Sequence, residues 1–367
     1  MVSLFIIDKY NTPSLNEHQI RIGFMEKNLL SVIIPVYNGE SALEHSLRSV
    51  LRQDCNNLEV VCVDDGSVDH TAEVLEKFAA DDPRLKIIRH EVNRGRMEAR
   101  RSGARNASGE YLMFLDADDA YDPGLCGHCV HLIRESGADM VQFSGKQVNQ
   151  ETGKTELLLP FTGKLSGAEI LKAFFISRVI PTTLWLKIYR TEIVQKAFSQ
   201  IPPLHSNMGE DVLISFFIAY FSNSFQGIQT RQKYNYNYGS GISSGLAIST
   251  EKFAQYCQMS RLPGIAFDFL KNYPENETVR EAAERMTVRL LLDCANMYEQ
   301  VPDPDKPKAA EMFREHWIGT PDLMKYILQA FAEQKQYIDT IYASSSYRLG
   351  NAIVLPLRSL LSGMKSR

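Results

Sequence analysis

Carboxylate side chains cluster at two places in the first third of the sequence, each time directly after a short apolar run. They are Asp64 and Asp65 after the first run, and Asp116, Asp118 and Asp119 after the second. Ligands of open parallel sheets bind beyond the carboxyl ends of the strands. Mg²⁺ and Mn²⁺ prefer hard oxygen ligands and combine one or two carboxylates with phosphate oxygens. The pattern therefore indicates a cation site for a phosphorylated ligand, with helix caps or turns as the alternative.

The segments around these carboxylates predict alternating strands and helices. Apolar, β-branched runs are typical of strands buried on both faces, and apolar residues spaced by three and four indicate helices. The expected strands cover residues 29–37, 58–63, 85–89, 111–115 and 139–143, and the expected helices cover 43–51, 72–78, 97–106 and 122–135. The last helix is expected to start with Asp122 as N-cap and Pro123 at its first position. This alternation predicts an α/β fold with a parallel sheet.

Later parts of the sequence have different patterns. Residues 144–165 show few apolar periods and are expected to form a loop or a hairpin. From about residue 250 the pattern becomes helical, with residues 279–298 as the clearest example. We therefore expect a helical C-terminal region after the α/β part.

Composition and charge restrict the class of protein. The chain has 367 residues, a length that suggests about two structural units. Its net charge of −4 argues against a nucleic-acid binder that acts through a general basic field. No run reaches the ~18 apolar residues of a membrane span, and no signal peptide is recognised, so the cysteines are expected to be reduced. Cys126 and Cys129 have metal-motif spacing, but on a helix they share one face and are expected to pack inward.

Four segments, in their order along the chain, resemble the motif series of glycosyltransferase family 2. They are Ser31–Asn38, Val63–Thr71, Gly109–Asp119 and Gly209–Asp211. The resemblance covers about residues 28–245. It implies the GT-A nucleotide-diphospho-sugar transferase fold, with a Rossmann-like, mixed but mainly parallel sheet, and sugar transfer from a nucleotide-sugar donor with inversion of the anomeric configuration.

The resemblance assigns donor-binding roles at the ends of two strands. Tyr37 corresponds to the aromatic residue that lies against the nucleotide base, and Pro35 and Val36 shape the strand end around it. Stacking on a base contributes roughly 1–3 kcal/mol. Asp65 matches the family's carboxylate that accepts a hydrogen bond from the uracil ring or the ribose, so a UDP-sugar is the expected donor. A sheet-edge tyrosine and an Asx turn at Asp65 are the alternatives.

The resemblance also assigns the diphosphate and metal ligands. Asp118 aligns with the aspartate that ligates the metal, and Asp116 aligns with the one that contacts the ribose or a metal-bound water. Arg100 aligns with the family's arginine near the diphosphate, and a guanidinium suits phosphate through its fork of donors. The chain departs from the usual pattern by carrying further arginines in this region, namely Arg94, Arg96, Arg101 and Arg105. Which arginine reaches phosphate stays open, and a solvated basic helix face is the alternative.

On the acceptor side, Asp211 matches the family's general base, which deprotonates the acceptor hydroxyl opposite the leaving group. Glu210 belongs to the same motif, and a carboxylate that caps the following helix is the alternative. Trp185 lies in a stretch that resembles the family's segment before the acceptor site. It is interpreted either as a ring that stacks on a sugar or as a core tryptophan. Residues 236–243 resemble a loop that closes over the donor.

Four regions are expected along the chain: an N-terminal extension at 1–27, a catalytic domain at 28–245, a helical region at 246–343 and a basic amphipathic tail at 344–367. Residues 1–24 precede the point where related chains usually begin, so they are interpreted as a dispensable extension or a misplaced start. The apolar and basic residues of the tail indicate contact with anionic lipid, with packing on its own domain or on a partner as the alternative.

The sequence thus predicts a metal-dependent, inverting hexosyl- or N-acetylhexosaminyl-transferase of surface-polysaccharide synthesis. Its acceptor is expected to be a hydroxyl of a glycan or polyprenyl-linked glycan, and its location the cytoplasm, peripheral to the inner face of the plasma membrane. Two other classes remain. One is a non-catalytic nucleotide-sugar or glycan-binding module, against which Asp118 and Asp211 argue. The other is a sugar-phosphate nucleotidyltransferase, whose glycine-rich N-terminal loop is replaced here by Pro35–Asn38.

Overall fold

A mixed sheet of eight strands forms the centre of the part of the chain that the computed structural model describes. The described residues are 30–55, 57–149, 152–238, 248–272, 277–320, 322–323 and 325–329. In spatial order the strands are β3 (Leu85–Arg89), β2 (Leu58–Asp64), β1 (Leu30–Val36), β4 (Tyr111–Phe114), β10 (Lys187–Arg190), β6 (Met140–Gln142), β11 (Ser224–Gly227) and β9 (Gly163–Ser166). The first four are mutually parallel, whereas β10 runs antiparallel to β4 and β6. The predicted α/β fold with a mixed, mainly parallel sheet is confirmed.

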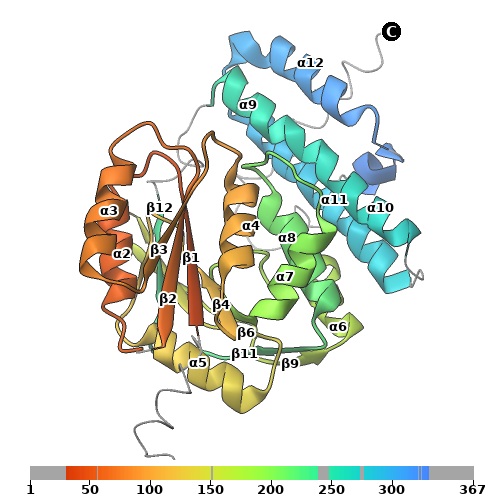
Figure 1. The fold of residues 1–367 in the computed structure, drawn as a ribbon. Helices are drawn as coiled ribbons and strands as arrows, with labels where there is room; N and C mark the ends of the chain where they lie inside the picture. Colours follow the sequence, from red (N-terminus) through yellow and green to blue (C-terminus); the bar gives the residue numbers. More distant parts are fainter. Residues whose placement is uncertain are drawn as a thin grey trace, which may run out of the picture.

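The two faces of this sheet bury separate apolar cores, because side chains alternate between the faces along each strand. In β1, which is buried throughout, Val32 and Ile34 belong to one core and Ile33 to the other. The first core also contains residues of α2 (Leu43–Leu51), α3 (Thr71–Asp81) and α5 (Leu125–Ser136), and the second contains residues of α4 (Arg96–Asn106), α7 (Thr191–Gln200) and α8 (Glu210–Phe221). Figure 1 shows α2 and α3 on one side of β1 and β2, with α4, α7 and α8 on the other.

A second sheet of four described strands lies beside the acidic cluster that follows β4. Its order is β5 (Ala120–Tyr121), β12 (Tyr234–Tyr238), β7 (Gly145–Asn149) and β8 (Thr155–Leu158). Because β7 and β8 pair antiparallel, the hairpin alternative for residues 144–165 is confirmed. β12 pairs with β5, which starts one residue after Asp119, so this sheet brings β12 next to the carboxylates.

The start of α5 differs from the prediction. The helix begins at Leu125, and its N-cap is Gly124 with a φ of 78°, instead of Asp122. The Asp122 carboxylate accepts the Lys233 N–H over 3.0 Å and the Asn235 side-chain amide over 3.1 Å. The expected N-cap therefore holds β12 against the end of the first sheet, a long-range role that local capping rules do not include.

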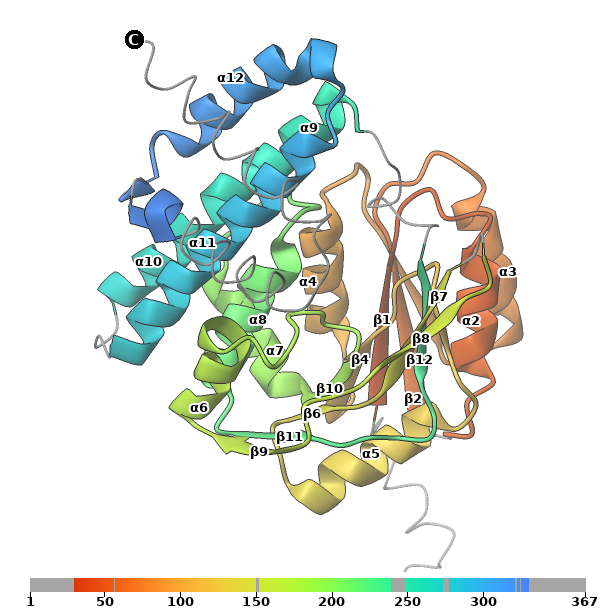
Figure 2. The same ribbon diagram turned by 180° about the vertical axis from the view of Figure 1, so that it is seen from behind.

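The described C-terminal helices are α9 (Thr250–Cys257), α10 (Leu262–Lys271), α11 (Glu277–Glu299) and α12 (Lys306–Trp317). α10 and α11 pack against α8, and α9 and α12 pack on α11 and on each other. Figure 2 shows this group of helices away from β1 and β2. Gly209, which precedes α8, has a φ of 71°. A Cβ at this position would lie 2.8 Å from Leu290 Cδ2 and 2.9 Å from Met259 Sδ. The helices therefore hold the start of α8 at close contact, and the predicted helical region is confirmed over these segments.

Several predictions fall on residues outside the described ranges. They concern residues 1–27, the basic tail at 344–367 and most of the loop at 236–243. Within the described residues, the helices are too short or too polar to cross a bilayer.

Candidate active site

The turns that follow β1 and β2 are joined by hydrogen bonds at the carboxyl edge of the sheet. Asn38, which has a φ of 50°, donates its backbone N–H to Ser67 Oγ over 2.9 Å. Pro35 and Val36 are buried at the end of β1, whereas the following Tyr37 is 48% exposed. The fold therefore supports Tyr37 on a fixed turn and leaves its ring accessible.

Asp65 holds the turn that leads into α4. Its Oδ1 accepts the Arg94 N–H over 2.9 Å, and its Oδ2 accepts the Gly95 N–H over 2.8 Å. The same Oδ1 lies 2.6 Å from Nδ1 of His90, whose Nε2 lies 2.8 Å from Ser102 Oγ. Because the residue is only 2% exposed, most of the hydrogen-bonding capacity of its carboxylate is used within the protein. A contact of Asp65 with a uracil or ribose stays a prediction.

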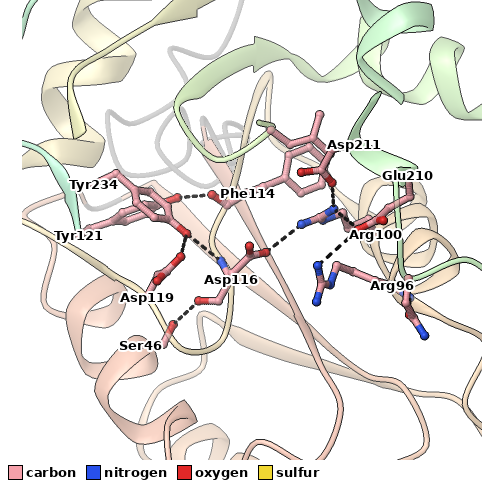
Figure 3. A network of polar contacts seen from close by, with 12 residues as sticks. Ser46, Arg96, Arg100, Phe114, Asp116, Asp119, Tyr121, Glu210, Asp211 and Tyr234 are labelled. Atoms are coloured by element: carbon pink, nitrogen blue, oxygen red, sulfur yellow. Dashed lines mark hydrogen bonds and ion pairs between the residues drawn. The ribbon is translucent and has the colours of Figure 1, made fainter. Parts of the chain in front are cut away.

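Arg100 joins residues of two distant motifs (Figure 3). Its guanidinium is fully buried and donates to Asp116 Oδ1 over 2.9 Å and to Glu210 Oε1 over 3.1 Å, and it also bonds to Asp211 Oδ1. The expected contact of Arg100 with phosphate stays a prediction, and in this structure the side chain is enclosed and its terminal nitrogens donate to carboxylates. The structure does bring the predicted Asp116, Glu210 and Asp211 together on one cation.

The charges of this network affect its carboxylates differently. Burial opposes ionisation of Asp116, but the guanidinium groups of Arg100 and Arg96 outweigh it and lower the pKa of the Asp116 carboxyl. Burial, reinforced by the charge of Asp211, raises the pKa of the Glu210 carboxyl. Asp211 is the more accessible of the two adjacent carboxylates, because its side chain is 27% exposed and that of Glu210 is 3% exposed. Asp211 is thus the one that a ligand can reach.

β12 fixes the second half of the acidic cluster. The Tyr234 hydroxyl donates to Asp119 Oδ2 over 2.6 Å and accepts the Asp116 N–H over 3.2 Å. The Asn237 N–H donates to Asp119 Oδ1 over 2.8 Å, and its side-chain amide donates to the Asp118 carbonyl oxygen. Burial, together with the charges of Asp116 and Asp118, raises the pKa of Asp119 to about 8. Asp119 therefore acts as an internal anchor, and Asp118 is left between it and Asp116 in the turn.

The acidic turn suits a divalent cation that shares its ligands with a nucleotide. Within the described ranges, no group of three or more His, Cys, Asp and Glu side chains is placed to hold a metal alone. Mg²⁺ and Mn²⁺ at nucleotide sites need only one or two carboxylates, because phosphate oxygens and water supply the other ligands. Asp118 and Asp116 meet that requirement. Cys126 and Cys129 are both buried in α5, as predicted.

Trp185 is a core residue of this region. Its ring stacks on Tyr234 at a centroid distance of 4.5 Å and on Tyr236 at 5.1 Å. The side chain is 7% exposed. The core interpretation of Trp185 is confirmed, because its side chain is buried and two neighbouring tyrosine rings stack on it. Its contact with Tyr234 connects it to the acidic turn.

His90, Tyr234 and Asn237 are site residues that the sequence reasoning missed. The alternation Tyr234–Tyr238 is typical of a strand, and this signal was available. Its pairing with β5, which brings Tyr234 and Asn237 to the carboxylates, is a tertiary contact across more than a hundred residues. His90 follows β3 directly, but nothing in its own neighbourhood in the sequence points to Asp65.

Comparison with known proteins connects this geometry to a family. Residues 31–206 match the family model described as Glycosyl transferase family 2. The chain is similar to the uncharacterized glycosyltransferase YibD of Escherichia coli (strain K12), with 31% identity over 46% of this chain and 50% of the relative. It is 29% identical, over 46% of this chain and 63% of the relative, to the GalNAc(5)-diNAcBac-PP-undecaprenol beta-1,3-glucosyltransferase of Campylobacter jejuni. The chain thus spans between half and two thirds of the length of these relatives.

Solved structures share the fold at lower sequence identity. The structure of S. aureus TarS in complex with UDP superposes with a TM-score of 0.57 at 21% identity, covering 87% of this chain and 93% of the other. The mannosyltransferase PcManGT from Pyrobaculum calidifontis, in complex with GDP-Man and Mn²⁺, gives a TM-score of 0.50 at 16% identity, covering 93% of this chain and 87% of the other. The expected GT-A fold is confirmed, and the match of residues 31–206 to the model of glycosyl transferase family 2 agrees with the resemblance of the four motifs.

Proposed function

We propose that this chain is a glycosyltransferase that moves a sugar from a nucleoside-diphosphate sugar to an acceptor hydroxyl, with inversion. One observation carries the proposal: Arg100 places Asp116 of the acidic turn and Asp211 of α8 on a single buried cation. An inverting transfer needs a donor site and a base that face the same anomeric carbon from opposite sides. Because Asp116 and Asp211 both bind the Arg100 guanidinium, the distance between the donor site and the base is fixed.

The donor is proposed to be a UDP-sugar. Tyr37 offers an exposed ring for the base at the end of β1, with Pro35 and Val36 beneath it and Asp65 holding the adjacent turn. The structure of S. aureus TarS was solved with UDP, which supports this nucleotide, whereas that of PcManGT was solved with GDP-Man. The donor screen described below distinguishes between UDP and GDP.

Asp118 and Asp116 would hold the divalent cation. A bound Mn²⁺ or Mg²⁺ would supply Lewis-acid stabilisation of the charge that develops on the departing diphosphate. Residues of the chain favour ionisation of one of these carboxylates and fix the turn that carries both. Arg100 and Arg96 favour the ionised form of Asp116, and β12 holds the turn through Asp119.

Asp211 is proposed as the general base. It lies in the first turn of α8 with a partly exposed side chain, and its bond to Arg100 fixes the position of the carboxylate. Glu210 is enclosed next to it and shares Arg100, so its proposed role is to position the base and not to contact the acceptor.

The acceptor is proposed to be a lipid-linked glycan of surface-polysaccharide synthesis. The support is the C. jejuni relative, whose name specifies an undecaprenol-linked acceptor. A cytoplasmic location, with the basic tail at 344–367 in peripheral contact with the inner face of the membrane, belongs to the same proposal. It rests on the apolar and basic pattern of that tail.

A donor-hydrolysis and binding screen tests the proposed function. UDP-, GDP- and dTDP-sugars are supplied with and without Mn²⁺ to the wild type, Asp118→Ala and Asp211→Asn. We expect one nucleotide class to be hydrolysed or bound in a Mn²⁺-dependent way. Asp118→Ala should abolish that dependence, whereas Asp211→Asn should bind the donor normally and lose about 10²–10⁴-fold in transfer. If the wild type binds and hydrolyses no nucleotide sugar, the proposed function fails.

A further inference from the structure

Five arginines lie in α4 or in the turn before it, and the terminal guanidinium nitrogens of two of them are engaged with protein groups. They are Arg94, Arg96, Arg100, Arg101 and Arg105. Arg100 is enclosed by three carboxylates. Arg101 is 3% exposed and pairs with Glu98, and its remaining nitrogens donate to the backbone oxygens of Phe198, Ile201 and Pro202. Neither has a nitrogen directed to a ligand at the sheet edge.

Position separates Arg96 from the other two. Arg105 is in the last turn of α4, nine residues after Arg96. At 1.5 Å per residue the two lie about 13 Å apart along the helix, with Arg105 away from the carboxylates. Arg94 is exposed in the turn and contributes its backbone N–H to Asp65. Arg96 is the arginine whose side chain both borders the Arg100 network and stays open, as Figure 3 shows.

The side chain of Arg96 makes only a weak contact with protein groups. This side chain is 32% exposed, and its Nη1 lies 3.5 Å from Glu210 Oε1, at the outer limit of a hydrogen bond. That same oxygen already accepts from Arg100 over 3.1 Å. Arg96 can therefore turn to a new anion without leaving Glu210 uncompensated.

The first two backbone N–H groups of α4 are already bonded within the protein. Free N–H groups at a helix N-terminus are often what binds phosphate. Here the Arg96 N–H donates to Asn207 Oδ1 over 2.7 Å, and the Met97 N–H donates to the Ser206 carbonyl oxygen over 3.2 Å. Since these two N–H groups are occupied, a side chain is the stronger candidate for binding a phosphate next to the start of α4.

Charge favours the same assignment. Asp116, Glu210 and Asp211 already share one buried cation, Arg100, so a diphosphate that enters beside them adds negative charge that Arg100 is not free to balance. We infer that Arg96, and not Arg100, binds the diphosphate of the donor nucleotide and of the nucleotide that leaves. This inference rests on the proposed function and assigns the phosphate contact of that same site.

Calorimetric binding of UDP and of uridine, each with Mn²⁺, tests this role independently of turnover. The proteins are the wild type, Arg96→Gln, Arg96→Lys and the matched control Arg105→Gln, which removes the same charge from the far end of the same helix. We expect Arg96→Gln to weaken UDP binding at least tenfold and to leave uridine binding unchanged, since uridine has no phosphate. Arg96→Lys should recover part of the loss, and Arg105→Gln should match the wild type for both ligands.

Each other result overturns the inference in a distinguishable way. Equal UDP affinity of the wild type and Arg96→Gln removes the role of Arg96 and leaves the proposed function intact. An equal loss in Arg105→Gln shows a general effect of charge. Unchanged UDP affinity together with a lower kcat/KM for a phosphate-bearing acceptor moves the contact to the acceptor. If the wild type binds none of UDP, GDP and dTDP, both the proposed function and the inference about Arg96 are wrong.

Discussion

The two halves of the candidate site are built by different means. The donor half, at the carboxyl ends of β1, β2 and β4, consists of turns that are fixed by hydrogen bonds between polar groups, such as those of Asn38 and Asp65. The base half is the start of α8, which apolar contacts of Gly209 with Leu290 and Met259 hold in place. The donor half thus depends on polar geometry and the base half on packing. Substitutions should separate binding of the nucleotide from the transfer step.

Arg100→Met should affect both halves, because it removes the cation that Asp116, Glu210 and Asp211 share. Breaking a buried ion network from one side leaves uncompensated buried charge and costs about 3–5 kcal/mol. We expect that loss in the free energy of unfolding by urea denaturation, together with weaker Mn²⁺-dependent nucleotide binding. Arg105→Met is the control. A loss of transfer with normal stability and normal nucleotide binding would show that the two halves do not depend on one cation.

Lys187 of β10, which is buried and interacts with the charge of Asp211, should make stability depend on pH. Its Nζ donates to the carbonyl oxygens of Pro181 and Thr183 over 2.7 and 2.6 Å. Burial lowers the pKa of Lys187 to about 7, although the charge of Asp211 opposes this shift. Since an unfolded lysine titrates near 10.4, the unfolded state binds more protons between these values, and stability rises with pH across that window.

Lys187→Met should abolish this dependence. Relative to the variant, the free energy of unfolding of the wild type should rise from about pH 7 to pH 10, by up to about 1.4 kcal/mol per pH unit. Urea denaturation at four pH values measures it, with the exposed Lys172→Met as control. Parallel curves for the wild type and Lys187→Met would contradict the assignment.

Gly209→Ala should affect the base half alone. Alanine at position 209 would have to adopt a φ of 71°, and its Cβ would lie less than 3 Å from Leu290 and Met259. We therefore expect a loss of about 2 kcal/mol in the free energy of unfolding and a lower kcat. Gly264 of α10 has open space around it and makes a matched control, because alanine there favours the helix. The UDP dissociation constant should be that of the wild type. A large change in it would show that α8 also shapes the donor half.

Tyr234→Phe should affect the donor half alone, and its effect should be smaller than those of the substitutions above. It removes the hydroxyl that bonds to Asp119 and to the Asp116 N–H. A lost hydrogen bond to a buried carboxylate is worth about 1–2 kcal/mol, so Mn²⁺-dependent UDP binding should weaken by roughly tenfold. Tyr121→Phe is the comparison, since that hydroxyl donates to the Phe114 carbonyl oxygen and not to a carboxylate. Equal effects of the two variants would remove the special role of Tyr234.

The difference between the two halves also explains which parts of the site could be predicted from the sequence. β1, β2, β3 and β4 and the carboxylates at their ends follow from apolar runs and turn residues, which are local signals. The position of Asp211 relative to Asp116 depends on Arg100, and the family pattern places that arginine near the diphosphate without showing its partners. The sequence therefore names Arg100 and the carboxylates of both motifs but does not show that they contact one another.

Local patterns did not decide the role of a residue where a distant partner competed with them. Asp122 precedes a proline and satisfies the capping rule, yet its carboxylate serves Lys233 and Asn235 instead. Trp185 is an aromatic residue near the expected acceptor site, but the two tyrosines of β12 cover it. In both cases β12 decides the outcome, and its pairing with β5 cannot be inferred from either neighbourhood alone.

The position of Trp185 between Tyr234 and Tyr236 gives the protein a built-in optical reporter. The chain contains two tryptophans, and Trp317 is the other. A Trp317→Phe background would leave a single indole fluorophore in contact with the tyrosine that bonds to Asp119. Its emission would follow a displacement of β12 when metal and nucleotide bind, so rapid-mixing fluorescence could time the response of the acidic turn without a chemical label.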